Sequence, residues 1–218
     1  QTERHRKAIQ MMGRTKEKSR TILSSAFIPC VIFAVVWYVS SHVLRYTMLM
    51  QEQKGIFLNT PGYYRQLFAD SWPIATLISD FLVQFYRVPG VGAAISALIV
   101  TLTYIGVCRL LRFLPLNKIL GTVAGAASWI AIAHANTPRT GVFILFASLL
   151  ALLVSTFIPY DKITVKLPLK DKFKAAMEGI CVALIVVAGV LVVRNEKIRE
   201  NERWYAVEYL TRVHDWST

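Results

Sequence analysis

Long apolar runs, nearly free of charge, dominate this chain of 218 residues. A helix of about 20 residues crosses the hydrocarbon core of a bilayer, which is roughly 30 Å thick. Backbone amides must find partners inside the bilayer, so such runs favour α-helices over barrel strands, which are about ten residues long and alternate in polarity. We therefore predict an all-α integral membrane protein with five transmembrane helices, at about residues 21–46, 91–111, 119–136, 141–158 and 174–193.

Composition agrees with this class, since 55% of the residues are hydrophobic and the mean hydropathy is +0.45. The net charge of +12 comes largely from basic residues that flank the predicted spans. The tail 1–20 contains no aromatic residue, whereas grooves that bind single-stranded nucleic acid combine basic with aromatic side chains. We expect no nucleic-acid partner. We expect contact with anionic lipid headgroups at a lysine-rich loop, through Lys162, Lys166, Lys170 and Lys172.

The distribution of Lys and Arg predicts the orientation in the membrane. Basic residues are concentrated in segments 1–20, 109–118 and 162–174, which the five predicted spans bring to one side. Because cytoplasmic loops carry the excess of positive charge, that side is predicted to be the cytoplasm. Residues 1–20 are then a basic cytoplasmic tail, 21–194 a membrane domain of five spans, and 195–218 an extracytoplasmic segment.

The segment 63–86 combines helical spacing of apolar residues with several charges. This pattern predicts one amphipathic helix that lies in the membrane interface or re-enters the membrane. In the structural interpretation, Asp80 pairs with Arg87 or Arg45. In the functional interpretation, Asp70, Asp80 and Arg87 are candidate catalytic residues of an outer-face glycosyl transferase or part of a proton- or cation-linked site.

Other polar residues of the apolar runs have structural interpretations. Glu178 is expected to pair with Lys174, one helical turn away. Gly121 and Gly125 permit close helix packing. The three cysteines fall in different runs and lack the spacing of a metal site, so we expect no metal and no cofactor.

The last segment, 195–218, predicts an amphipathic helix that continues the final span. Its apolar residues recur at helical spacing and include several aromatic side chains. This pattern is similar to the first helix of a tetratricopeptide-like repeat, which cannot bury its apolar face alone and is followed by further repeats in a longer chain. We expect a protein partner to bind there, through Trp204, Tyr205, Tyr209 and Trp216.

Several short strings also resemble a known family. Pro61-Gly62, the run 81–86, Pro89 and Gly92 resemble an uncharacterised family of Bacteroidota membrane proteins, as do Glu202–Tyr205 and Tyr209-Leu210. The resemblance implies a polytopic domain in the bacterial inner membrane, followed by a periplasmic helical-repeat region. It implies no activity.

The predicted function is therefore that of a non-enzymatic inner-membrane anchor or subunit of a cell-envelope assembly. The chain would present its extracytoplasmic helix to a partner. A function of another class remains open, namely a lipid-linked glycosyl transferase or small transporter that uses the acidic residues at the outer face. The chain contains no Walker loop, HExxH motif or recognisable catalytic triad.

Overall fold

The computed structural model describes residues 26–54, 58–88, 90–135, 139–160 and 171–215, and these residues form helices with no strand. The predicted all-α class is confirmed for this part of the chain. In chain order the helices are Ala26–Val43, α2 (Arg45–Lys54), α3 (Pro61–Phe68), α4 (Pro73–Val83), the 3-10 helix η1 (Gln84–Arg87), α5 (Val91–Leu110), α6 (Asn117–His134), α7 (Arg139–Phe157), α9 (Asp171–Arg194) and α10 (Glu196–Asp215).

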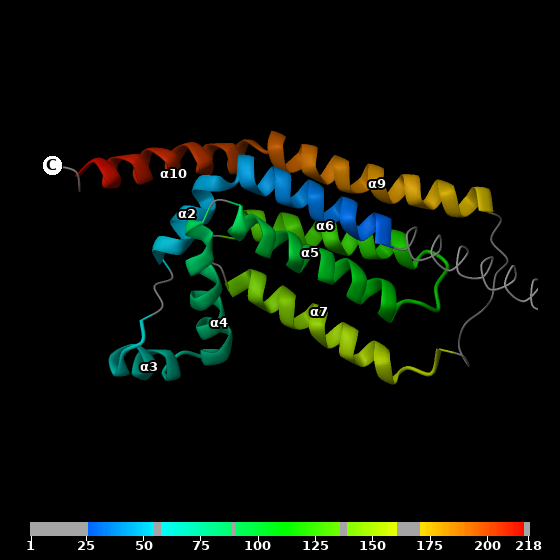
Figure 1. The fold of residues 1–218 in the computed structure, drawn as a ribbon, viewed down its shortest axis with the longest axis horizontal. Helices are drawn as coiled ribbons and strands as arrows, with labels where there is room; N and C mark the ends of the chain where they lie inside the picture. Colours follow the sequence, from blue (N-terminus) through cyan, green and yellow to red (C-terminus); the bar gives the residue numbers. More distant parts are fainter. Residues whose placement is uncertain (1–25, 55–57, 89, 136–138, 161–170, 216–218) are drawn as a thin grey trace, which may run out of the picture.

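Long helices lie side by side and alternate in direction along the molecule (Figure 1). Helix 26–43, α5, α6, α7 and α9 form this bundle, in which α5 contacts both α6 and α7, and α6 also contacts α9. The short helices α2, α3 and α4 gather at one end of the bundle, and α10 extends beyond the same end. The end of α7 and the start of α9 lie at the opposite end.

Four helices of the described chain are long and apolar enough to cross a membrane. They are Ala26–Val43, Val91–Leu110, Arg139–Phe157 and Ala176–Arg194. The predicted span 119–136 corresponds to α6, which is not among these four. Its 18 residues include Asn117, Lys118 and His134 at the ends and several Gly, Ala and Ser between them, so its composition is less apolar than that of its neighbours.

The bundle core is formed where helix 26–43, α5, α6 and α9 meet. Ile32, Val36, Trp129 and Ile185 are completely buried there. Gly121 and Gly125 lie against α5, and a β-carbon at Gly121 would stand 3.0 Å from the Tyr104 carbonyl oxygen. The two glycines of the predicted packing motif therefore allow α6 to approach α5 closely.

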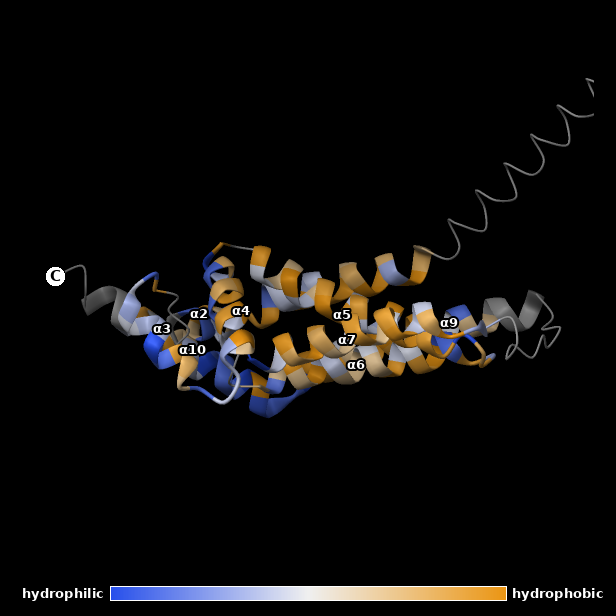
Figure 2. Cartoon of the chain, turned by 90° about the horizontal axis from the view of Figure 1, so that it is seen from below, coloured by the Kyte–Doolittle hydropathy of each residue, from blue (hydrophilic) through white to orange (hydrophobic). Residues whose placement is uncertain are grey.

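The outer surface of the bundle is apolar as well. Large side chains on α7 and α9 point outward, among them Leu150, Leu153, Phe157 and Leu191. Figure 2 shows hydrophobic residues along the bundle and hydrophilic residues gathered near α2, α3 and α10. A water-soluble bundle would expose its polar faces, so this surface is suited to an apolar solvent.

The single amphipathic helix predicted over 63–86 is wrong, because the segment forms three helices. Pro73 is the reason for the first break. It stands at the start of α4, and Trp72 before it has φ −136° and ψ 65°, outside the helical region. A proline disfavours helical backbone in the preceding residue but fits the first position of a new helix. Figure 1 shows α4 lying across the axis of the bundle.

Two helix junctions at the end of the bundle that bears α10 also differ from the predicted boundaries. The sequence predicts a first span that extends to residue 46, but helix 26–43 ends at Val43 and α2 begins at Arg45. The tail helix is separated from α9 by Asn195, whose side-chain oxygen accepts the Ile198 N–H at 3.2 Å. Asn195 is thus the N-cap of α10.

Candidate functional site

A buried carboxylate fixes the tail helix to the bundle. The Glu202 side chain on α10 accepts hydrogen bonds from the backbone N–H groups of Tyr46 at 3.0 Å and Thr47 at 2.9 Å. These two residues lie in the first turn of α2, and that turn contains no acidic residue. Since N–H groups in the first turn of a helix lack intrahelical acceptors, Glu202 caps α2 from a distant part of the chain.

The environment of Glu202 opposes its ionisation. The side chain is only 9% exposed. Burial raises the pKa of Glu202, while its hydrogen bonds to Thr47 and Tyr46 act in the opposite direction. Burial outweighs the hydrogen bonds, so the folded protein holds the Glu202 proton more tightly than an exposed glutamate would.

Further contacts attach the first turns of α10 and the adjacent α2 to the bundle. Ile198 is 2% exposed and belongs to the main core cluster. The Gln51 amide of α2 donates to the Ala135 carbonyl oxygen at the end of α6, at 3.0 Å. The beginning of α10 is therefore held by apolar packing and by hydrogen bonds.

Beyond this anchored part, α10 exposes an apolar stripe. Trp204, Val207 and Leu210 recur every three residues and are 67%, 62% and 57% exposed. We call these three residues the α10 stripe. Of the other predicted partner-binding residues, Tyr205 is half-buried. Trp216 and the side chain of Tyr209 lie outside the described part of the structure.

Asp70 joins the α3–α4 connection to the bundle. Its carboxylate accepts a hydrogen bond from the Thr76 hydroxyl at 2.9 Å and pairs with the Arg139 guanidinium of α7 at 2.8 Å. The Thr76 hydrogen bond is the largest cause of the lowered pKa of Asp70, and the charge of Arg139 also contributes. These contacts give Asp70 a structural role in holding α4 against α7.

Asp80 has a partner that differs from those predicted. Its carboxylate accepts a hydrogen bond from the Tyr63 hydroxyl of α3 at 2.8 Å, and the described residues contain no ion pair between Asp80 and Arg87 or Arg45. Burial, this hydrogen bond and the Asp80 charge together raise the pKa of Tyr63 to about 12. The Tyr63–Asp80 hydrogen bond therefore connects α3 to α4.

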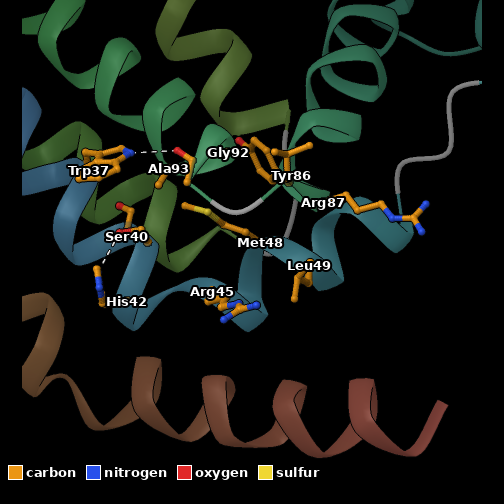
Figure 3. Close-up of a pocket in the computed structure, with 13 residues that line it drawn as sticks. Trp37, Ser40, His42, Arg45, Met48, Leu49, Tyr86, Arg87, Gly92 and Ala93 are labelled. Atoms are coloured by element: carbon orange, nitrogen blue, oxygen red, sulfur yellow. Dashed lines mark hydrogen bonds between the residues drawn. The ribbon is translucent and has the colours of Figure 1, made fainter. Parts of the chain in front are cut away.

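The three candidate catalytic residues each have their own surroundings. No hydrogen bond or ion pair among the described residues joins any two of Asp70, Asp80 and Arg87. Arg87 instead lines a pocket between η1 and the end of helix 26–43 that contains no carboxylate (Figure 3). Within the described residues, no three His, Cys, Asp or Glu side chains gather as metal ligands.

At the opposite end of the bundle, Glu178 pairs with Lys118 of α6 at 2.7 Å. The predicted partner of Glu178, Lys174, has its side chain outside the described part of the structure. Of the predicted lipid-binding lysines, Lys162, Lys166 and Lys170 lie outside the described residues, as does the side chain of Lys172. Their predicted role is untested. The predicted basic tail 1–20 also lies outside the described residues.

Comparison with known proteins yields a family and no closer relative. The chain belongs to DUF6057, a family of unknown function whose sequence profile matches residues 19–213. No curated protein and no solved structure matches the chain. Membership of an uncharacterised family is thus confirmed. The match includes helix 26–43 and nearly all of α10, so the family's sequence profile covers both the bundle and its tail helix.

Proposed function

We propose that this member of the family is a non-enzymatic multi-pass protein of the bacterial inner membrane that holds α10 on the periplasmic side as a docking helix for a protein partner. The observation that carries the proposal is the contrast within α10. Glu202 and Ile198 fix its first turns to the bundle, whereas the α10 stripe is left exposed. A helix that is fixed to the bundle at its start and exposes an apolar stripe further along is suited to the role of an anchor or subunit of an envelope assembly.

The bundle surface supports insertion into a membrane. Helices of 18 to 20 residues carry outward apolar side chains along their length. At 1.5 Å per residue such helices are about 30 Å long, which matches the hydrocarbon thickness. The helix α6 runs in the bundle beside two of the candidate spans, so we propose that it crosses the membrane with them, giving five crossings.

The ends of the bundle support the proposed orientation. Helix 26–43, α6 and α9 begin, and α5 ends, at the end of the bundle opposite α10 (Figure 1). The sequence segments that adjoin these helix ends, 1–20, 109–118 and 162–174, hold 15 of the 25 Lys and Arg residues. Segments rich in Lys and Arg remain in the cytoplasm, so α10 would lie in the periplasm. The helix α4 lies across the bundle axis and exposes Ile74 and Phe81, which suits a helix in the plane of the outer interface.

The transferase or transporter hypothesis has less support. Such a site needs a carboxylate that is accessible to a substrate or proton path. Asp70 is engaged by Arg139 and Thr76, and Asp80 by Tyr63. Both carboxylates therefore have sufficient structural explanations.

The docking role is tested with two sets of substitutions in the full chain. We expect Trp204→Ala, Val207→Ala and Leu210→Ala together to abolish recovery of the partner in a gentle-detergent purification followed by mass spectrometry. In a typical interface, a few aromatic and aliphatic side chains that the partner buries supply most of the affinity, so truncating them removes most of the binding. The matched control changes the exposed residues Lys197, Glu200 and Arg203 of the same helix to alanine.

The control set should retain every protein that the unaltered chain recovers. If the stripe variant inserts in the membrane and still recovers the same proteins in the same amounts, the docking role of α10 is wrong. An equal loss in both variants would also contradict it, because the stripe would then have no special part.

A further inference from the structure

A second site lies at the junction where the bundle meets α2 and η1. Here a pocket of about 260 Å³ opens beside the end of helix 26–43 and the start of α5 (Figure 3). Its apolar walls include Trp37, Met48 and Tyr86, and its polar members include Ser40, Arg45 and Arg87. The pocket lies at the level where the apolar spans end, which is the depth of lipid headgroups if the bundle crosses a membrane.

The apolar walls are fixed by specific contacts. The Trp37 indole N–H donates to the Gly90 carbonyl oxygen at 3.0 Å, and Gly90 has φ 80°, which favours glycine. Tyr86 packs directly on Gly92, where a β-carbon would stand 2.7 Å from a Tyr86 ring carbon. Two aromatic rings from different elements are thus held in place before any ligand binds, which reduces the entropy cost of binding.

The charge of the pocket is positive and uncompensated. Arg45 and Arg87 both line it, and neither makes an ion pair among the residues that the structure describes. Arg87 lies at the outer edge of the pocket, where its side chain extends away from Trp37 and Ser40 (Figure 3). Glu202, which lies beside the start of α2, accepts backbone N–H groups of Tyr46 and Thr47 and leaves Arg45 available. The Ser40 hydroxyl, buried in the same wall, has no hydrogen-bond partner in the described structure.

We propose that this pocket binds a phosphate-bearing anion, and specifically the headgroup phosphate of an anionic phospholipid. Guanidinium groups bind phosphate oxygens through paired hydrogen bonds, and a lipid also supplies the apolar portion that Trp37, Met48 and Tyr86 would contact. Inorganic phosphate shares this charged group but not the apolar part. Only the lipid source of the phosphate rests on the proposed membrane insertion, and the site does not depend on α10 docking a partner.

The test uses the purified full chain in detergent and a phosphatidylglycerol carrying a photoreactive group near its headgroup. After illumination, peptide mass spectrometry locates the attached residues. We expect attachment to the peptides around Trp37, Leu49 and Arg87. Excess phosphatidylglycerol should suppress it, whereas phosphatidylcholine and inorganic phosphate should not. Suppression by millimolar inorganic phosphate alone would assign the site to free phosphate and overturn the lipid.

Matched arginine variants separate this pocket from general attraction to basic surfaces. Arg45→Gln with Arg87→Gln should lower attachment at these peptides at least about tenfold, since hydrogen bonds from a charged guanidinium to phosphate are stronger than those between neutral groups. Arg65→Gln with Arg203→Gln removes the same charge from exposed positions outside the pocket and should leave attachment within about twofold.

The conservative pair Arg45→Lys with Arg87→Lys should retain part of the attachment, because it keeps the charge and loses the paired geometry. Circular dichroism of each variant checks that the helices are intact. Equal loss in the pocket and control variants, or no attachment at these peptides in the unaltered chain, would overturn the site. Neither result would bear on the docking role of the α10 stripe.

Discussion

At the scale of single residues, the polar contacts join segments that are distant in the sequence. Glu202 caps α2 across 156 and 155 residues, and Gln51 reaches Ala135 across 84. Each contact satisfies a backbone group at the end of a helix, where intrahelical partners are missing. The end of the bundle that bears α10 is therefore held together by a few side chains whose loss should be measurable.

Replacing Glu202 by alanine should release α10 from α2. The substitution leaves the Tyr46 and Thr47 N–H groups without an acceptor, and an unsatisfied buried donor costs about 1–3 kcal/mol. We expect faster hydrogen exchange at these two amides and along the first turns of α10. Glu200→Ala, on an exposed position of the same helix, is the control and should leave exchange unchanged. Unchanged exchange in Glu202→Ala would mean that the cap does not stabilise the contact.

Tyr63 should ionise at a pH well above that of an ordinary tyrosine. Its pKa is raised to about 12, so the folded protein binds the phenol proton more tightly than the unfolded chain does. The contribution of Tyr63 to stability is therefore complete below about pH 10 and falls as the pH rises toward 12. Ionisation of tyrosine can be followed by ultraviolet absorbance as the pH is raised. The absorbance change that is lost in Tyr63→Phe should have its midpoint near pH 12 in the unaltered chain. Asp80→Asn should lower that midpoint, and a midpoint at the ordinary value of 10 in the unaltered chain would contradict the contact.

The polar residues of interest can be recognised in the sequence, but their partners cannot. The sequence predicts Arg87 or Arg45 as the partner of Asp80 and Lys174 as the partner of Glu178. Of these, Arg87 and Lys174 lie within two helical turns, because local spacing is the main guide to pairing in a single sequence. The structure pairs Asp80 with Tyr63 on a separate helix and Glu178 with Lys118, which is 60 residues away. The role of Glu202 as a cap had no local signal, since the helix that it caps lies elsewhere in the chain.

At the scale of elements, Gly92 allows η1 to lie close to the start of α5, as Gly121 allows α6 to lie close to α5. Gly92→Ala should destabilise the turn from η1 into α5, because the new β-carbon would stand 2.7 Å from a Tyr86 ring carbon and 2.9 Å from its Cα. Overpacking of this kind typically costs about 1–3 kcal/mol. Thermal unfolding in detergent should show a lower midpoint than for the unaltered chain.

Gly62→Ala supplies the control for this substitution. A β-carbon at Gly62 would have no heavy atom within 4 Å, and the residue lies in α3 without a positive φ. Alanine has a higher helix propensity than glycine, so the unfolding midpoint should stay the same or rise slightly. Equal destabilisation by the two substitutions would show that the Tyr86 contact is unimportant.

The long helices could be predicted because an apolar run of spanning length leaves few other choices. The short ones could not be delimited in the same way. Over 63–86 the helical spacing of apolar residues continues through the break, and the signal for that break was Pro73 alone. Likewise Asn195, a favoured N-cap residue, marks the start of α10 within a pattern that otherwise favours one continuous helix.

At the scale of the whole molecule, the alternating directions of the bundle helices set the relation between its two ends. Alternation follows from the order of helices and short connections. The choice of neighbours, with α5 against α6 and α7 and α6 against α9, depends on side-chain packing that hydropathy does not encode. Two features support the proposed membrane insertion, namely the apolar outer surface and the polar groups collected at the end with α2, α3 and α10.

The central claim is that the bundle crosses a membrane and holds α10 on the side opposite the lysine-rich loop. Single cysteines at Glu200 and at Lys166, introduced after replacing Cys30, Cys108 and Cys181, test it with a membrane-impermeant maleimide. We expect the cysteine at 200 to be labelled in intact spheroplasts and the cysteine at 166 only after the membrane is opened. Labelling of position 166 in intact spheroplasts, or equal labelling of both positions, would contradict the claim.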